Sequence, residues 1–176
     1  MPDQPLGREQ IEALVHEVAR ELGDDGAPHT VILVGGSLLA WHHLRESTVD
    51  VDTIRRLAPE LAHAVEVVAA RHGLAPRWMN DHAAAFAPQT FDESSCEVLL
   101  ETSRLQVLGM RLRDAFLMKL FAGRARDHDD LVSLWPRTGF ASAREAVEAM
   151  YDAYPAAPRD EYLEAFVADI AAEATS

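Results

Sequence analysis

The stretch His29-Thr-Val-Ile-Leu-Val34, followed directly by Gly35-Gly36-Ser37, decides the fold class of this chain. Residues 29–34 are apolar and β-branched, which predicts a short buried strand. The two glycines break that strand, and residues 37–44 have the composition of a helix capped near Ser37. Such a turn exposes backbone N–H groups at a helix N-terminus, where the helix dipole favours a phosphate. Gly-Gly-Ser is also common in ordinary turns, so the phosphate interpretation depends on residues further along the chain.

The next decisive stretch is Thr48-Val-Asp-Val-Asp-Thr-Ile54, in which polar and apolar residues alternate as in a half-buried strand. Because residues i and i+2 of a strand share a face, the carboxylates of Asp50 and Asp52 are predicted to point the same way. Two close carboxylates repel each other, and Mg²⁺, a hard cation that prefers oxygen ligands, would relieve that repulsion. One short helix and one turn separate Ser37 from Asp50, which is the length needed to return antiparallel beside the first strand. The alternative is a solvated strand face without a metal.

The remaining pattern predicts an α+β fold. Apolar periodicity predicts further helices at residues 6–22, 59–72, 111–122, 127–135, 142–154 and 159–172. Pro136 is expected to close the helix at 127–135, strands at 97–100 and 105–108 to form a hairpin, and 75–89 to hold a short strand and then a loop or helical turn. This order implies a small mixed β-sheet with helices packed on it and a helical C-terminal part. The length predicts one domain over residues 1–176, with a core at about 28–135 and a helical extension at about 141–173.

Composition restricts the class of protein. Apolar residues make up 48% of the chain and charged residues 26%, as in an ordinary globular protein. No apolar run reaches the ~18 residues of a membrane span, and the first residues lack the pattern of a signal peptide. We therefore expect a cytoplasmic protein with no membrane partner. The net charge of −13 argues against broad, sequence-independent binding of nucleic acid, which requires neutralised phosphates.

Basic side chains are nevertheless concentrated in one stretch. Six of the sixteen basic residues lie within residues 104–126: Arg104, Arg111, Arg113, Lys119, Arg124 and Arg126. They predict a local basic face that could receive a polyanion such as a triphosphate. Lys119 is the one lysine of the chain, and a compact ammonium suits a site that meets a phosphate as a point charge. Chance in an arginine-rich composition is the alternative.

Together these motifs carry a family resemblance. Gly35-Gly36-Ser37 followed by Arg45-Glu-Ser-Thr-Val-Asp50-Val-Asp52 resembles the first motif of the polymerase-beta-type nucleotidyltransferase superfamily. More narrowly, the chain resembles the bacterial toxin nucleotidyltransferases of the AbiEii and MenT type and their uncharacterised relatives. Those proteins carry a later lysine helix that runs into Arg-x-x-Asp, which corresponds here to the stretch from Met118 to Leu131. The resemblance covers about residues 30–134 and implies a nucleotidyltransferase-type sheet.

The resemblance also implies an activity: Mg²⁺-dependent transfer of a nucleoside monophosphate from a nucleoside triphosphate to a hydroxyl acceptor. Gly35, Gly36 and Ser37 would hold the β- and γ-phosphates of the nucleotide. Asp50 and Asp52 would bind one or two Mg²⁺ ions, which bridge phosphate oxygens and neutralise developing charge.

The resemblance gives further residues a role. Lys119 would contact the triphosphate as charge builds. Asp127 and Asp130 would assist the metal, orient Lys119 or hold Arg126, whereas an aspartate at position 127 is also an ordinary N-cap of the next helix. Arg45 is expected to brace the aspartate strand rather than to touch substrate.

One departure from the family pattern leaves two functions open. Many superfamily enzymes place a third carboxylate on a neighbouring strand, and only Glu97 and Glu101 lie near such a strand here, in no matching motif. The first hypothesis is an enzyme whose acceptor is a tRNA 3′ end or a Ser, Thr or Tyr side chain, acting within a toxin–antitoxin pair. The second is a noncatalytic nucleotidyltransferase-like module, such as an antitoxin or regulator. An α+β domain of unrelated role is the third alternative.

Overall fold

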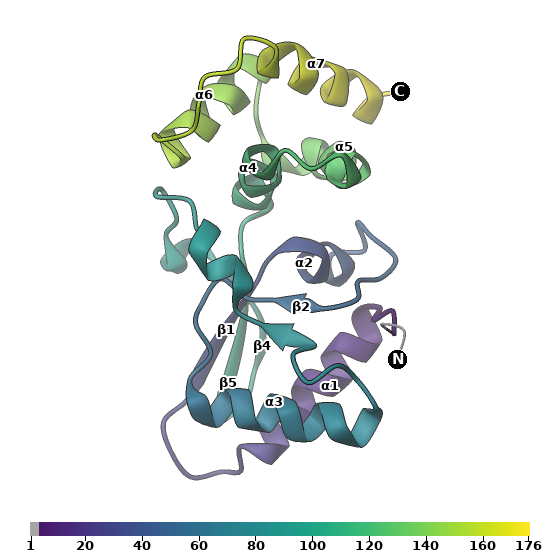
Figure 1. The fold of residues 1–176 in the computed structure, drawn as a ribbon, viewed down its shortest axis with the longest axis vertical. Helices are drawn as coiled ribbons and strands as arrows, with labels where there is room; N and C mark the ends of the chain where they lie inside the picture. The colour runs from purple at the N-terminus through teal and green to yellow at the C-terminus, as the bar shows by residue number, and fades with distance from the viewer. Residues whose placement is uncertain (1–3) are drawn as a thin grey trace. The chain divides into compact units, whose positions relative to one another are not determined.

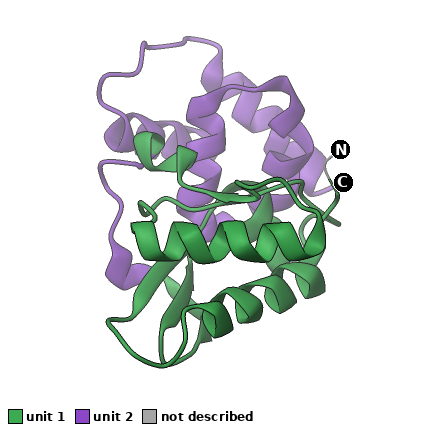
Figure 2. Ribbon diagram, turned by 60° about the horizontal axis from the view of Figure 1, so that its bottom comes forward, with its two compact units in different colours: residues 1–86, 96–110 green, residues 87–95, 111–176 purple. Residues whose placement is uncertain are grey.

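A three-stranded mixed sheet organises the first of two units into which the contacts of the chain divide (Figure 2). This computed structural model describes residues 4–176. The first unit comprises the chain up to Phe86 together with Cys96–Met110, and the second comprises Ala87–Ser95 and Arg111–Ser176. The expectation of a single domain over residues 1–176 stays a prediction.

The sheet of the first unit has the order β1-β5-β4. Strand β1 (His29–Leu33) pairs in parallel with β5 (Leu105–Gly109), and β4 (Glu97–Glu101) pairs antiparallel with β5. The predicted hairpin is therefore confirmed. So is the α+β class with a small mixed sheet, helices packed on it and helices at the C-terminal end. The strands form because their apolar residues have a core to fill: the Val31, Leu33 and Val107 side chains are fully buried.

Three helices and a second pair of strands complete this unit (Figure 1). Helix α1 (Arg8–Glu21) packs on α2 (Gly35–Trp41) and α3 (Pro59–His72), and buries an apolar stripe. Strands β2 (Val51–Asp52) and β3 (Met79–Asn80) pair in parallel, and a 3₁₀ turn, η1 (His82–Phe86), comes after β3. The predicted short strand and helical turn within 75–89 are therefore confirmed.

The first predicted helix starts two residues later than expected. Leu6 was expected to lie in that helix, yet its N–H donates to the Thr48 carbonyl at 2.6 Å and its carbonyl accepts from the Thr48 N–H at 3.0 Å. These two bonds hold Leu6 as a β-bridge, so the helix begins only at Arg8. Pairing with a distant segment overrides the local apolar period, which gives no information about such a partner.

The second unit is helical. Its helices are α4 (Leu112–Ala122), α5 (His128–Thr138), α6 (Ala143–Ala153) and α7 (Leu163–Ala174), with short 3₁₀ turns η2 (Glu93–Ser95) and η3 (Ala125–Asp127). Helix α5 packs on α4 and α7, and α6 also contacts α4 and α7. The rings of Phe116, Trp135 and Phe140 lie within 5.7–6.3 Å of one another and form the aromatic centre of this packing.

Two predicted helix boundaries in this unit are wrong. Pro136 does not close α5 but lies within it, shortly before its end at Thr138, where its fixed φ suits a helix and few internal hydrogen bonds are lost. The last helix begins at Leu163 rather than at 159. The Asp160 N–H donates to the Tyr151 hydroxyl at 2.8 Å and the Asp160 carboxylate accepts from the Tyr162 N–H at 2.9 Å, so this segment is held as a turn.

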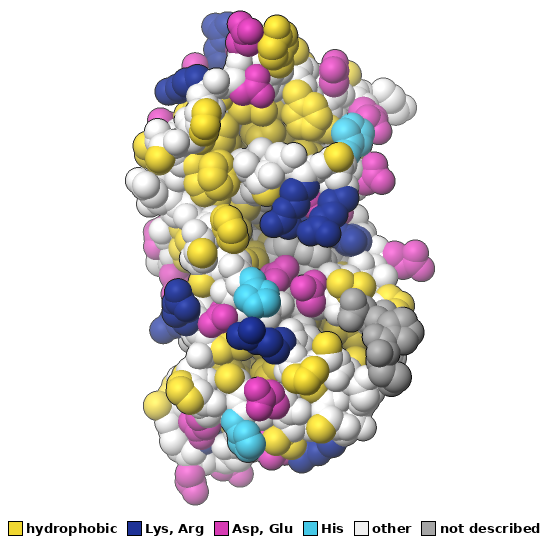
Figure 3. All heavy atoms as spheres, viewed as in Figure 1, with side chains coloured by type: hydrophobic (Ala, Val, Ile, Leu, Met, Phe, Trp, Pro, Cys, Tyr) yellow, Lys and Arg dark blue, Asp and Glu magenta, His cyan; other side chains and the backbone are white. Residues whose placement is uncertain are grey.

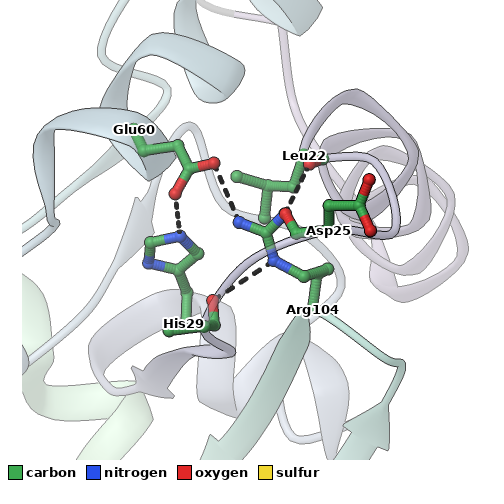
Figure 4. A network of polar contacts seen from close by, with 6 residues as sticks. Leu22, Asp25, His29, Glu60 and Arg104 are labelled. Atoms are coloured by element: carbon green, nitrogen blue, oxygen red, sulfur yellow. Dashed lines mark hydrogen bonds and ion pairs between the residues drawn. The ribbon is translucent and has the colours of Figure 1, made fainter.

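Arg104 is not part of a basic face, contrary to the prediction. Its side chain is 2% exposed and runs through the interior of the first unit (Figure 4). The guanidinium donates to the carbonyls of Leu22, Asp25 and Ala27 and to Glu60 Oε1, the last at 2.8 Å. Arg104 therefore ties the loop that leads into β1 to helix α3, and its charge is used inside the fold.

Within residues 4–176, the structure has no helix that combines the length and the apolar character of a membrane span.

Candidate functional site

The glycine turn after β1 places the Asp52 carboxylate against bare backbone. Gly35 has a φ of +59°, which favours glycine. A Cβ built on Gly35 would lie 3.2 Å from Asp52 Oδ2. The Val34 N–H donates to the Asp52 carbonyl at 3.1 Å, and Leu33 and Thr53 form an antiparallel bridge. The predicted antiparallel return of the chain beside the first strand is therefore confirmed, and it brings Asp52 to the turn.

Gly36 is a second point of close approach. A Cβ at this position would lie 2.6 Å from Thr48 Oγ1 and 3.4 Å from Arg45 Nη1. Thr48 is buried, while Arg45 is exposed and donates from Nε to the Ser47 carbonyl at 2.8 Å. Both glycines of the motif are thus required by neighbours that contact the turn, and Arg45 lies beside the turn as well as beside the loop that carries the aspartates.

Ser37 does not cap the helix, contrary to the prediction. The helix begins at Gly35, so Ser37 lies inside α2 with a fully buried side chain. Its Oγ donates to the Val34 carbonyl at 2.9 Å, which fastens the helix to the end of the strand. The contact of Ser37 with a phosphate stays a prediction.

Asp50 and Asp52 do not share one strand. Strand β2 has only two residues, because β3 offers in-register partners only to Val51 and Asp52. Asp50 lies in a bend before it, and both aspartates are half-buried. The argument from strand geometry that both carboxylates point one way is therefore wrong for Asp50. Their joint binding of a metal stays a prediction.

Asn80 is a site neighbour that the sequence did not reveal. It is the register partner of Asp52 in the parallel pair β2–β3, and side chains in register on adjacent strands lie on the same side of a sheet. Asn80 is 4% exposed, and its Oδ1 accepts from the His82 N–H at 3.0 Å. Glu97 and Glu101, the carboxylates considered from the sequence, lie on β4 in the other sheet. The residue beside Asp52 on the neighbouring strand is therefore a neutral amide.

The second unit holds the other predicted residues in a buried ion-pair cluster. Lys119 Nζ lies 2.9 Å from Asp127 Oδ1 and 2.8 Å from Asp130 Oδ2. The Lys119 side chain is 10% exposed and both aspartates are 9% exposed. Helix α4 ends at Ala122, and Gly123 caps it with a φ of +58°, so the chain turns sharply and η3 leads Asp127 back to the lysine.

In this cluster, Asp127 and Asp130 each contact the Lys119 ammonium. Asp127 is the N-cap residue of α5, as the alternative interpretation expected, but its side chain makes no capping hydrogen bond there. Both carboxylates contact the Lys119 ammonium, one of the contacts that the resemblance implied. Arg126, in contrast, is exposed and its side chain has no partner among residues 4–176. Burying one ammonium with two carboxylates leaves one excess negative charge, which is tolerated only with good geometry and further hydrogen bonds.

No group of three or more His, Cys, Asp or Glu side chains suited to hold a metal occurs among residues 4–176. Asp50 and Asp52 are two oxygen donors, so an ion there would take its other ligands from phosphate oxygens and water, as Mg²⁺ commonly does.

Comparison with known proteins identifies the family. No curated protein matches the chain, and no solved structure matches it. Residues 10–152, about four fifths of the chain, match a family model described as "Nucleotidyltransferase of unknown function (DUF6036)". The expected superfamily is thereby confirmed, while the narrower likeness to AbiEii- and MenT-type toxins stays a prediction. The chain thus belongs to the DUF6036 family of nucleotidyltransferases of unknown function.

Proposed function

We propose that this protein is a Mg²⁺-dependent nucleotidyltransferase that moves a nucleoside monophosphate from a nucleoside triphosphate to a hydroxyl acceptor. One observation carries the proposal. The Asp52 carboxylate lies against Gly35, at a turn where a side chain on either glycine would crowd its neighbours. A carboxylate beside accessible backbone is what a metal-bound phosphate requires, and the family supports the choice of a nucleotide.

The residues present fit a triphosphate and its metal. The two glycines are partly exposed and carry no side chain, which would let phosphate oxygens approach the backbone, and Asp52 with Asp50 supplies hard oxygen ligands. Bound to these carboxylates, Mg²⁺ would neutralise charge that develops on the phosphate oxygens. Arg45 lies within reach of Gly36 and is proposed to hold the turn and the aspartate loop together.

The transfer itself requires few protein groups. The acceptor hydroxyl oxygen forms a bond to the α-phosphorus, and the bond from that phosphorus to the oxygen bridging the α- and β-phosphates breaks. Pyrophosphate leaves with the electron pair, and the hydroxyl proton is released to solvent. Catalysis then rests on positioning and on charge stabilisation, as in other phosphoryl-group transfers.

Lys119 is proposed to act first as a positioning residue. Its ammonium is engaged by Asp127 and Asp130, and it thereby fixes the segment that joins α4 to α5. The contact of Lys119 with the triphosphate stays a prediction.

The acceptor and the biological setting belong to the same proposal. The acceptor is the 3′ end of a tRNA or a Ser, Thr or Tyr side chain of a protein. The likeness to toxin nucleotidyltransferases favours a role within a toxin–antitoxin pair, with a cognate partner protein.

The proposal is tested by label transfer. The purified protein is incubated with each α-labelled nucleoside triphosphate, Mg²⁺, total tRNA and cell lysate. An Asp50→Ala/Asp52→Ala variant is the test, and Asp129→Ala, which removes an exposed carboxylate in the second unit, is the control. Label on an RNA or protein band that disappears only in the double variant supports the proposal and names the acceptor class. Equal labelling by both variants and the wild type would overturn it.

The neutral Asn80 beside Asp52 favours a second candidate, a noncatalytic module that binds nucleotide without turnover. An amide cannot accept the acceptor proton as a carboxylate would. Mg²⁺-dependent nucleotide binding in calorimetry without any transferred label would select this candidate. Asn80→Asp then offers a direct check, because restored transfer in that variant would trace the missing activity to this position.

A further inference from the structure

Arg124 and Arg126 are exposed cations without partners among residues 4–176, in a chain dominated by acidic residues. The chain has 29 acidic and 16 basic residues, so a surface arginine is expected to find a carboxylate. Three other arginines of the second unit do: Arg111 pairs with Asp114, Arg113 with Glu145 and Arg144 with Glu164, whereas Arg137, which lies alone in the chain, has no partner among residues 4–176. Arg124 and Arg126 make no side-chain hydrogen bond, ion pair or ring contact in the described part of the chain.

The structure reduces the predicted basic stretch to these two residues. Of its six members, Arg104 and Lys119 are buried and neutralised inside the fold. Arg111 and Arg113 are held by carboxylates. On the face shown in Figure 3, basic side chains form a few separate groups among acidic and apolar ones and make no continuous basic surface. An electrostatic role for this stretch therefore falls on Arg124 and Arg126.

The segment that carries the two arginines is held rigidly at both ends. Gly123 ends α4 in the left-handed conformation, Arg124 is extended, and η3 begins directly after it. At the other end, Asp127 is anchored to Lys119 by the 2.9 Å hydrogen bond. An anchored backbone lowers the entropy that a ligand must remove on binding, so that mainly the two arginine side chains remain to be ordered.

We propose that Arg124 and Arg126 bind phosphate groups of a substrate of the transfer reaction. This proposal rests on the function proposed above and adds the residues that recognise a polyanion. Guanidinium groups form paired, charge-assisted hydrogen bonds with phosphate oxygens.

Two sources of phosphate are distinguished by two probes on the full chain. One is a fluorescently labelled single-stranded RNA, measured by anisotropy over about 50–200 mM salt. The other is a nonhydrolysable nucleoside triphosphate with Mg²⁺, measured by calorimetry. The test variant is Arg124→Gln/Arg126→Gln. The matched control is Arg77→Gln/Arg137→Gln, which removes the same charge from two exposed arginines that also lack partners among residues 4–176.

The expected result is a loss of affinity of about tenfold or more in the test variant, with the control within about twofold of the wild type. Loss for RNA, with a salt slope that falls by about 1.4 for two lost contacts, assigns the site to backbone phosphates. Loss for the nucleotide alone assigns it to the triphosphate. Equal effects of the two double variants, or a wild type that binds neither probe, would overturn the proposal.

The outcome is separable from that of the proposed function. If the wild type transfers no label while phosphate binding still depends on Arg124 and Arg126, the proposed function fails and this inference stands. If transfer occurs and depends on Asp52, but the affinity for both probes is unchanged in Arg124→Gln/Arg126→Gln, the proposed function stands and this inference fails. Thermal unfolding of each variant checks that the exposed substitutions leave the fold intact.

Discussion

The glycine turn of the first unit and the lysine cluster of the second handle charge in opposite ways. At the turn, Asp52 is half-buried and lies against backbone that carries no side chain. In the cluster, Lys119 is nearly buried and its ammonium is within 2.9 Å of two carboxylates. The first arrangement keeps a partly exposed carboxylate beside bare backbone, while the second buries its carboxylates against an ammonium.

This difference separates function from stability. A buried charge must keep its partner, since an unpaired ion in the interior costs several kcal/mol. A half-buried carboxylate is still solvated, so it carries a smaller structural penalty. We therefore expect substitutions at the turn to act mainly on activity, and substitutions in the cluster to act mainly on folding.

The largest effect is expected from Asp52→Ala. Label transfer should fall at least about 1000-fold, because the carboxylate that faces the glycine turn no longer holds the metal and its phosphate. The free energy of unfolding in urea should change by about 1.5 kcal/mol or less. Asp129→Ala is the control. If Asp52→Ala lost stability as severely as it lost activity, the distinction between the two regions would be wrong.

Lys119→Met should act through the fold instead. Removing the ammonium takes the Lys119 charge away from the buried Asp127 and Asp130 carboxylates, which should lower the free energy of unfolding by about 3–5 kcal/mol. Urea denaturation measures this, with exposed Arg137→Met as the control. A decrease below about 1 kcal/mol would show that the cluster is hydrated and available to ligands, so that both regions would handle charge alike.

Local patterns in the sequence predicted most of the elements. The apolar period located α3 at 59–72 and the helical C-terminal part, and β-branched runs located β1 and the β4–β5 hairpin. These features depend on residues that are neighbours along the chain. The link between the glycine turn and Asp52 was also predictable, because the distance from Ser37 to Asp50 allows only one short helix and a return.

Features that depend on distant partners were not predictable. Arg104 looked like a surface cation, but it reaches the carbonyls of Leu22 and Ala27 about 80 positions away in the chain. The position of Asn80 beside Asp52 could not be predicted, because it depends on the pairing of β2 and β3. The same applies to Asp50, whose place outside the strand results from how few residues β3 offers.

Gly36→Ala sharpens the comparison within the turn. The added Cβ would lie 2.6 Å from Thr48 Oγ1, and the resulting crowding should cost about 1–3 kcal/mol of stability. Nucleotide binding should weaken as well, since the crowding would displace the turn that carries the proposed phosphate contacts.

The double variant Gly36→Ala/Thr48→Ala provides the matched test, because it removes the hydroxyl that the new methyl group meets. Denaturation of both single variants and the double variant gives the coupling energy, which should offset part of the loss. Additive losses would show that the glycine is required for a reason other than this contact.

The smallest effect is expected from the ion pairs of Glu60. Like the lysine cluster, these ion pairs stabilise the fold and have no proposed role in ligand binding. The hydrogen bond from Arg104, and then that from His29, holds the pKa of Glu60 below its usual value of 4.5. A lowered pKa in the folded state means that the unfolded chain takes up the proton first. The stabilisation is therefore present at neutral pH and is lost as the pH falls below 4.5 through the folded pKa.

Glu60→Gln should therefore be less stable than the wild type at pH 7, and urea denaturation between about pH 7 and 3 should show the two curves converge at the acid end. Glu66→Gln on the same helix, whose side chain has no partner among residues 4–176, should match the wild-type curve throughout. If the stability curves of both variants converged with the wild-type curve only at acid pH, the acid sensitivity would not be specific to Glu60. Convergence for Glu60→Gln alone ties it to the carboxylate that pairs with Arg104.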